Sequence, residues 1–166
     1  MIRKATPSDA KAIVDIYNYY IAHSIATFDE KPFTMVEMAS KINHVSKTYP
    51  WLVKEINGKV IGFAYASEWR AKSAYKFAAE TTIYFHPDAP KGLGTALYSR
   101  LLEILQTKNI HTAIGVISVP NEPSVRLHQK LGFIKAARFK EVGFKFDKWI
   151  DVDYWQLMLN DFSPQV

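Results

Sequence analysis

The chain of 166 residues contains no cysteine. A disulfide framework, a thiolate nucleophile and cysteine-ligated zinc or iron–sulfur sites are therefore excluded. No stretch approaches the roughly 18 apolar residues of a membrane-spanning helix, since the longest apolar runs, such as residues 60–66, have the length of a strand. The opening segment MIRKATPSDA lacks the apolar run of a signal peptide. These absences predict a cytoplasmic protein without a membrane partner.

Long runs of like charge are also missing. Lysine and arginine number 21 against 16 acidic residues, which gives a net charge of +5, but the basic residues are scattered along the chain. A nucleic-acid-binding domain would need clustered charge, so no nucleic-acid partner is expected, whereas a polyphosphorylated small molecule remains compatible. With 48% apolar residues and no linker or repeat, residues 1–166 are predicted to form a single packed domain.

Two capping motifs predict two helices near the start of the chain. Residues 6–9, TPSD, combine a capping hydroxyl, a proline at the first helical position and an acid, and apolar residues at helical spacing then extend the helix over residues 7–22. Thr34 and Glu37 form a second capping box ahead of an apolar stripe that ends at Val45. A short strand over residues 2–5 is predicted to precede both helices.

Strands dominate the middle of the chain. Asn57-Gly58 separates the apolar runs 51–56 and 60–66, and this pair is typical of a hairpin with a type I′ turn. Residues 67–77 are polar and irregular, and residues 78–86 predict a further strand that ends before two prolines.

The second half of the chain alternates helices and strands. A helical apolar stripe runs from Leu93 to Leu105, a strand follows over residues 111–119, and a short helix ends at Gly132. The aromatic segment 133–159 predicts two more strands. The resulting order, β-α-α-β-β-β-α-β-α-β-β, indicates an α+β fold.

Gly92 and Gly94 lie in the turn between the strand 78–86 and the next helix. Free backbone amides at a helix N-terminus suit a phosphate group, and glycine allows the main chain to approach it closely. The turn lacks the third glycine of a dinucleotide-binding motif and the lysine of a P-loop, so on its own it also fits an ordinary connector.

An ordered series of motifs follows this turn. The segment Asn121-x-x-Ser124-x-x-x-His128 precedes Leu131-Gly132-Phe133, and together with the glycine turn it resembles the GCN5-related N-acetyltransferase (GNAT) superfamily over essentially the whole chain. The resemblance implies an αβα-layered fold, with a mixed, mostly antiparallel sheet of about seven strands flanked by about four helices.

Further segments narrow the resemblance to the phosphinothricin and methionine sulfoximine N-acetyltransferase branch. They are AETTIY at 79–84, PNEPSVRLH at 120–128, VGFK at 142–145, WIDV at 149–152 and WQ at 155–156. One position departs from the superfamily pattern, because Ala89 stands where a glutamine or arginine is usual. A side-chain contact to phosphate is lost there, while backbone contacts remain available.

The resemblance implies acetyl-CoA as the co-substrate and no metal. The strand before the glycines would run beside pantetheine, and the turn amides would hold the pyrophosphate. Asn121 would contact the pantetheine amides or simply cap its helix, and Lys130 would meet a phosphate or remain solvated. The cofactor-binding residues expected on this basis are Ile83, Tyr84, Phe85, Lys91, Gly92, Leu93, Gly94, Thr95, Asn121 and Lys130.

Two residues are expected to be catalytic. Glu80 lies near the start of the central strand in an apolar or hydroxylic stretch, where burial would raise its pKa and suit it to accept the proton of an amine; the alternative is a carboxylate paired with a nearby Lys or Arg. His128 occupies the position at which many GNAT members carry the tyrosine that protonates the coenzyme thiolate. It could be that acid, a base, or a buried structural histidine.

The acceptor side is expected to hold an amino-acid-like molecule. In the resembling branch, the segment that contains Arg70 and Lys72 helps to bind the substrate, and arginine suits a carboxylate. Phe28 matches an aromatic position that lines the pocket, and ordinary surface charge and aromatic packing are the alternatives for all of these residues. The substrate-binding residues expected are Phe28, Arg70, Lys72, Tyr75, Thr81 and Thr82.

The sequence therefore predicts an acetyl-CoA-dependent N-acetyltransferase that acts on the α-amino group of phosphinothricin, methionine sulfoximine or methionine sulfone by direct attack in a ternary complex. The alternatives are acetylation of a peptide N-terminus or polyamine, and a non-catalytic acyl-CoA-binding module. A homodimer is expected from the family and from the aromatic tail, whose side chains could equally complete the core.

Overall fold

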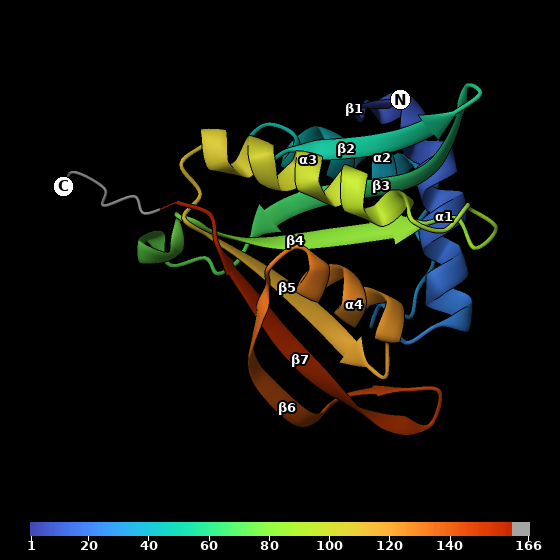
Figure 1. Ribbon diagram of the computed structural model, residues 1–166. Helices are drawn as coiled ribbons and strands as arrows, with labels where there is room; N and C mark the ends of the chain where they lie inside the picture. The colour runs from blue at the N-terminus through green and yellow to red at the C-terminus, as the bar shows by residue number, and fades with distance from the viewer. Residues whose placement is uncertain (161–166) are drawn as a thin grey trace.

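The computed structural model describes residues 1–160, so the last six residues of the predicted domain lie outside it. This part of the chain contains seven strands and four α-helices in the predicted order (Figure 1). The strands are β1 (Ile2–Lys4), β2 (Trp51–Ile56), β3 (Lys59–Glu68), β4 (Ala78–Phe85), β5 (Thr112–Val119), β6 (Ile134–Lys145) and β7 (Lys148–Met158). The helices are α1 (Ala10–His23), α2 (Met35–Val45), α3 (Leu93–Thr107) and α4 (Glu122–Lys130).

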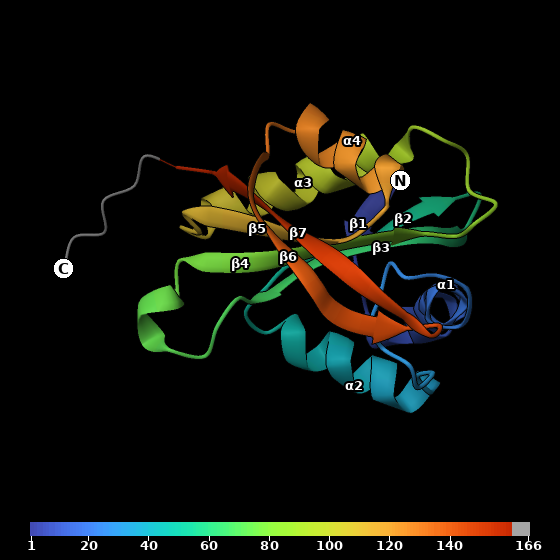
Figure 2. The same ribbon diagram turned by 90° about the horizontal axis from the view of Figure 1, so that it is seen from below.

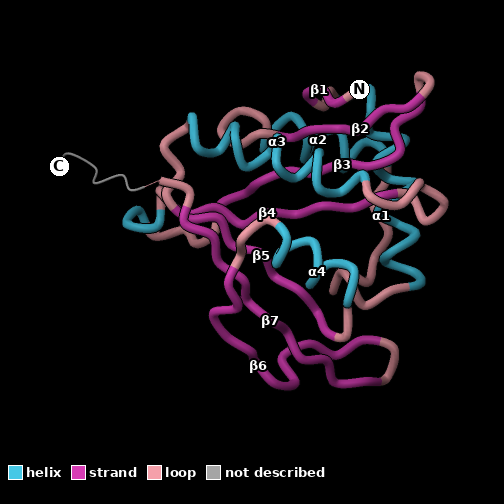
Figure 3. The backbone as a smooth tube through the Cα atoms, in the orientation of Figure 1, coloured by secondary structure: helices cyan, strands magenta, loops and turns pink. Residues whose placement is uncertain are grey.

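The strands form one sheet in the order β1-β2-β3-β4-β5-β7-β6. Every neighbouring pair is antiparallel except β4 and β5, which run parallel. Their pairing begins at Ala78 with Thr112 and ends at Thr81 with Gly115, although each strand continues for four more residues. The two strands diverge beyond this last pair, as the backbone tube shows (Figure 3).

The sheet has helices on both faces. Seen edge-on in Figure 2, α3 and α4 lie on one side and α1 and α2 on the other. Each side has its own core: Leu97 and Leu101 of α3 pack with Trp155, and Ile13 and Ile16 of α1 belong to the second cluster. The predicted αβα-layered α+β fold is therefore confirmed.

The local sequence signals account for most element boundaries. Thr34 Oγ1 accepts a hydrogen bond from the backbone N–H of Glu37, and the Glu37 carboxylate accepts one from the N–H of Thr34, so the predicted capping box forms. The hairpin turn between β2 and β3 uses Asn57 and Gly58 at φ of 49° and 76°, as a type I′ turn requires. The first helix differs slightly from the prediction, because residues 7–9 form a 3-10 turn ahead of α1.

Candidate active site

A cavity of about 440 Å³ lies where β4 and β5 separate. Its walls come from α1, from the connection after α1, from β3, β4 and β5, and from the first two turns of α4. Residues 80–85 of β4 all line it. The end of regular pairing between the two parallel strands therefore opens a cavity in the middle of the sheet.

Side chains of β4 alternate between the two sides of the sheet. Tyr84 points toward α1, where its ring packs 5.2 Å from that of Tyr17 and 5.0 Å from that of Tyr20. Thr81 points toward α3, where its hydroxyl lies 2.6 Å from that of Tyr98. By the same alternation, Glu80 faces the α1 side of the cavity. A ligand in this cavity can therefore be reached from both sides of the sheet.

Glu80 is a partly buried carboxylate. Burial raises its pKa, and the positive charge of Arg70 opposes that shift. Within residues 1–160, no lysine or arginine nitrogen lies within 4.0 Å of its oxygens. The direct ion pair weighed as its alternative role is therefore not formed, and its environment is that of a base that titrates above its usual range.

His128 is buried, with 3% of its surface exposed, and both ring nitrogens have partners. Nδ1 lies 2.8 Å from the carbonyl oxygen of Ser124, to which it donates, and Nε2 lies 3.0 Å from the hydroxyl of Tyr98. Burial lowers the pKa of His128, which favours the neutral ring, while the bond to Ser124 opposes this. His128 is thus a hydrogen-bonded wall residue of the cavity.

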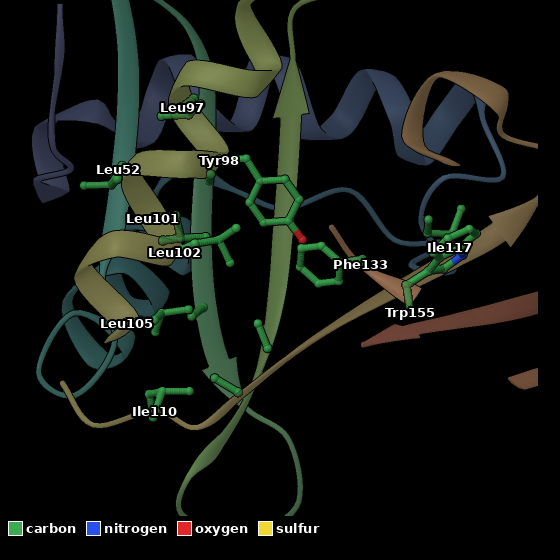
Figure 4. Packing of buried hydrophobic residues seen from close by; sticks show 14 residues of the cluster. Leu52, Leu97, Tyr98, Leu101, Leu102, Leu105, Ile110, Ile117, Phe133 and Trp155 are labelled. Atoms are coloured by element: carbon green, nitrogen blue, oxygen red, sulfur yellow. The ribbon is translucent and has the colours of Figure 1, made fainter. Parts of the chain in front are cut away.

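The Tyr98 hydroxyl connects His128 to the point at which the strands part. Tyr98 is fully buried on α3, with its ring beside that of Phe133 (Figure 4). Its hydroxyl lies 2.6 Å from that of Thr81, whose single hydrogen is shared between the Tyr98 oxygen and the carbonyl of Ile114 on β5, 3.1 Å from Oγ1. This buried network ties α3, α4, β4 and β5 together at the closed end of the cavity.

Gly115 makes room for the His128 ring. A Cβ atom at this position would overlap Nε2 and Cδ2 of His128. Because Gly115 is also the last β5 residue paired with β4, the absence of a side chain lets the histidine lie directly against the point of strand separation.

The N-terminus of α3 is uncapped. Gly92 is its N-cap residue, with φ of 90°, and it has no side chain to accept hydrogen bonds from the first amides of the helix. In α4, by contrast, Asn121 Oδ1 accepts from the N–H of Ser124 at 3.3 Å. The amides at Leu93, Gly94 and Thr95 are thus available to an anion, and the glycine turn fits a phosphate group.

The expected cofactor residues fall into two groups. Ile83, Tyr84, Phe85 and Asn121 line the cavity. Lys91, Gly92, Leu93, Gly94, Thr95 and Lys130 do not. Those at the glycine turn lie at the start of α3, beyond the end of β4 (Figure 1), and Lys130 is exposed at the end of α4.

The expected acceptor residues divide in the same way. Phe28, Thr81 and Thr82 line the cavity. Arg70, Lys72 and Tyr75 are exposed on the connection between β3 and β4, outside the cavity lining. The Arg70 guanidinium stacks on the ring of Trp69, 4.0 Å from its centroid. Its positive charge opposes the rise in the pKa of Glu80, so Arg70 lies close enough to the cavity to act on this carboxylate.

A short segment after α1, residues 24–28, is called the pocket loop here, and residues 25–28 of it form one wall of the cavity. Lys145 of β6 holds it, donating from Nζ to the carbonyls of Ser24 at 2.9 Å and Thr27 at 2.8 Å. Only 4% of Lys145 is exposed, and burial lowers its pKa. A buried ammonium bonded to two main-chain carbonyls fixes the loop more firmly than apolar packing alone.

Other strands complete this attachment of the pocket loop. Tyr84 donates its hydroxyl to the carbonyl of Ala26 at 2.7 Å, and Ser118 of β5 donates to the carbonyl of Ile25. The ring of Phe28 packs against Gly143 of β6, where a Cβ atom would overlap it. The predicted aromatic wall residue is therefore held in place by the VGFK segment.

Sequence reasoning did not identify several wall residues. Tyr17 and Tyr20 of α1 and Tyr65 of β3 line the cavity, but in the sequence they are indistinguishable from the apolar faces of a helix and a strand. Tyr98 was missed for the same reason. The available signal was the number of tyrosines, nine in this chain, at positions where a purely apolar core would use phenylalanine or leucine.

The comparisons with known proteins agree with this geometry. Residues 2–153 match the model of the acetyltransferase (GNAT) domain, and the chain belongs to this family. It is an N-acetyltransferase, and acetyl-CoA is its co-substrate.

Particular relatives point to the same branch of the family. The chain is 40% identical to a phosphinothricin N-acetyltransferase of Streptomyces viridochromogenes over 93% of this chain and 85% of that one. It is 35% identical to an L-methionine sulfoximine/L-methionine sulfone acetyltransferase of Salmonella typhimurium, with coverage of 98% and 96%. The crystal structure of a phosphinothricin acetyltransferase from Sinorhizobium meliloti in complex with acetyl-CoA matches this chain with a TM-score of 0.95 at 34% identity, covering 99% of this chain and 92% of that one.

None of the helices in residues 1–160 is long and apolar enough to cross a membrane. The same residues contain no group of three or more His, Asp or Glu side chains placed to hold a metal ion.

Proposed function

We propose that the protein acetylates the α-amino group of a small amino-acid analogue, with phosphinothricin, methionine sulfoximine and methionine sulfone as the first acceptors to examine. The observation that carries this proposal is Glu80, a partly buried carboxylate on the α1 side of the cavity that has no direct ion-pair partner among residues 1–160. The names of the relatives support the choice of acceptors.

In the proposed reaction, acetyl-CoA supplies a thioester whose carbonyl carbon is attacked directly by the amine. A carbon–nitrogen bond forms, the carbon–sulfur bond breaks, and Glu80 takes the proton that the amine loses. The backbone amide of Ile83 is assigned to polarise the carbonyl. Residues 82–85 lie beyond the last β4–β5 pair, so in the described part of the chain no strand pairs with them on that side, although the carbonyl of Phe85 accepts a hydrogen bond from Tyr20.

His128 is the proposed proton donor to the departing sulfur, and this role requires the doubly protonated ring, which burial disfavours. Because Nδ1 already donates to Ser124, the proton would leave from Nε2, and the contact between Nε2 and the Tyr98 hydroxyl has to be released during turnover. If a His128→Asn variant keeps full kcat, His128 takes no part in the reaction and has only the structural role that its hydrogen bonds give it.

The remaining expected residues have roles at the two ends of the ligand. Lys91, Gly92, Leu93, Gly94 and Thr95 are assigned to the pyrophosphate, which the uncapped start of α3 suits, and Lys130 to an outer phosphate. Arg70 is assigned to the acceptor carboxylate, since its guanidinium is held against Trp69 and acts on the pKa of Glu80. Lys72 and Tyr75 belong to the same exposed connection and would complete the acceptor side.

The test is thiol release from acetyl-CoA with each acceptor, beside a blank without acceptor and the Glu80→Gln variant. Acceptor-dependent release that falls at least a hundredfold in the variant supports the proposal, because general-base catalysis contributes about 10²–10⁴-fold. Release that persists in the variant assigns the base elsewhere. No release with any of these acceptors, while acetyl-CoA still raises the melting temperature, rejects the acceptor class.

We further propose that the chain acts as a single cytoplasmic domain and as a homodimer through the outer face of the β6–β7 hairpin. Phe139, Phe144, Phe146 and Trp149 are about half exposed or more on this hairpin, and the rings of Phe144 and Trp149 contact each other. Trp155 of β7 is buried in the core, so this part of the aromatic tail completes the core, and the exposed rings are the ones assigned to the interface. Sedimentation of wild type and Trp149→Ser tests the dimer, which the substitution should weaken.

A further inference from the structure

Lys41 of α2 holds a positive charge close to the cavity, and no carboxylate in the described part of the chain pairs with it. Its ammonium lies 5.3 Å from the ring centroids of Phe33 and Tyr65 and 5.8 Å from that of Tyr17. Within residues 1–160, no Asp or Glu oxygen lies within 4.0 Å of it. The rings stabilise the cation in a half-buried position without neutralising it.

The only hydrogen bond of this ammonium to a described residue is to the hydroxyl of Tyr65, at 3.4 Å. The Tyr65 oxygen therefore accepts from Lys41, and its own hydrogen remains available. Tyr65 is 8% exposed, stacks 4.1 Å from Trp51, and lines the cavity. Its ring is thus fixed, and its hydroxyl is a donor strengthened by an adjacent positive charge.

The other three cavity tyrosines differ from Tyr65 in this respect. Tyr17 donates to the carboxylate of Asp29 at 2.6 Å, Tyr20 to the carbonyl of Phe85 at 2.8 Å, and Tyr84 to the carbonyl of Ala26 at 2.7 Å. Each of these hydroxyls has a fixed acceptor in the protein. Among the cavity tyrosines, Tyr65 alone has a hydroxyl hydrogen with no acceptor in the described part of the chain.

Sheet register places this donor near Glu80. Tyr65 pairs with Thr82, and Glu80 is two residues further along β4, which makes Tyr65 and Glu80 diagonal neighbours about 7–8 Å apart. Both side chains line the same cavity. An amino acid whose amine lies at Glu80 therefore has its side chain within reach of Tyr65.

We propose that Tyr65 and Lys41 form a subsite that selects acceptors whose side chains end in oxygen atoms, and that it favours a negatively charged end. The Tyr65 hydroxyl donates to one of these oxygens, and the Lys41 ammonium supplies the charge behind it. The subsite rests on the proposed function and deepens it, because it discriminates between acceptors that share an amine and an α-carboxylate. The carboxylate of Asp29 is engaged by the hydroxyl of Tyr17, whose ring lies beside Lys41.

The test compares kcat/KM for phosphinothricin, whose side chain is an anion, and methionine sulfone, whose side chain carries neutral oxygens. Tyr65→Phe should lower kcat/KM for both acceptors roughly tenfold or more, since a hydrogen bond to a polar or charged end is lost. Lys41→Met should lower kcat/KM for phosphinothricin about tenfold more than for methionine sulfone. The KM for acetyl-CoA should remain unchanged in both variants.

Two matched variants control for unspecific effects. Lys47→Met removes an exposed positive charge just after α2, and Tyr49→Phe removes a hydroxyl outside the cavity; neither should alter the ratio between the two acceptors. Equal losses for both acceptors in Lys41→Met, or no loss in Tyr65→Phe, would overturn the subsite while leaving the acetyltransferase proposal standing. If wild type acetylates neither acceptor, both the proposed function and the subsite are rejected.

Discussion

Replacing Tyr98 with phenylalanine isolates the buried network at the closed end of the cavity. The substitution keeps the ring and removes a hydroxyl that lies 2.6 Å from Thr81 Oγ1 and 3.0 Å from His128 Nε2. Thr81 retains the carbonyl of Ile114 as an acceptor, whereas Nε2 of His128 loses its only partner among the described residues. The variant therefore leaves one buried polar atom unsatisfied.

The expected cost follows from that atom. An unsatisfied buried group costs about 1–3 kcal/mol, and for a chain of this size each kcal/mol lowers the melting temperature by roughly 2–4 °C. The melting temperature of Tyr98→Phe should therefore fall by roughly 2–12 °C. Thermal unfolding followed by circular dichroism at neutral pH, where His128 is neutral, is a suitable measurement.

A control variant and a double-mutant cycle make this prediction specific. Tyr49→Phe removes a hydroxyl that has no hydrogen-bond partner in the described part of the chain, and it should leave the melting temperature nearly unchanged. Thr81→Val and the double variant with Tyr98→Phe should show a coupling of about 0.5–3 kcal/mol, as expected for residues in one network. A Tyr98→Phe protein as stable as wild type, or additive losses in the cycle, would refute the network as a stabilising unit.

Three further substitutions test other parts of the structure. Gly115→Ala should reduce the free energy of unfolding by about 1–3 kcal/mol in urea titrations because its Cβ overlaps His128, and unchanged stability would contradict the packing described. Lys145→Met should raise the acceptor KM in steady-state assays while the acetyl-CoA KM stays constant, since only the pocket loop loses its hydrogen bonds; equal changes in both constants would point to general unfolding. Arg3 lowers the pKa of Asp9 below 3.8, so the stability from this pair is complete above that value and is lost as pH falls through the lower folded pKa. Asp9→Asn should thus destabilise the protein at pH 7 and flatten the acid limb of its stability profile, and an unaltered limb would argue against the pair.

The activity profile should also depend on pH through Glu80. Its pKa is raised by burial, so kcat/KM for the acceptor should increase as pH rises through that value, where the carboxylate becomes able to accept a proton. In Glu80→Gln this limb should disappear from a profile measured at saturating acetyl-CoA. A limb that persists in the variant would belong to another group.

The order of elements was predictable because each boundary has a local chemical cause. The capping box at Thr34 and the Asn57-Gly58 turn act over four residues or fewer, and both formed as predicted. The family motifs likewise placed Glu80 and His128 on the cavity wall. What the motifs did not reveal is that the two residues approach the cavity from opposite sides of the sheet.

The rest of the site depends on contacts between distant parts of the chain. Lys145 reaches the carbonyl of Ser24 across 121 positions of sequence, and no local pattern distinguishes it from a surface lysine. The three tyrosine donors and Tyr65 likewise differ only in what surrounds their hydroxyls. Such differences arise from tertiary packing, so they were accessible only once the fold was known.

Because the pairing between β4 and β5 ends early, the two halves of β4 should also differ in their backbone dynamics. Up to Thr81 and Gly115, β4 has a strand on both sides, but beyond them β3 is its only partner among the described strands. Amides of β4 that face the opening should exchange their hydrogens with deuterated solvent much faster than amides of the same strand below Thr81. Within β4, binding of acetyl-CoA should slow exchange in this half of the strand alone, which would make the opening a reporter of occupancy that does not depend on turnover.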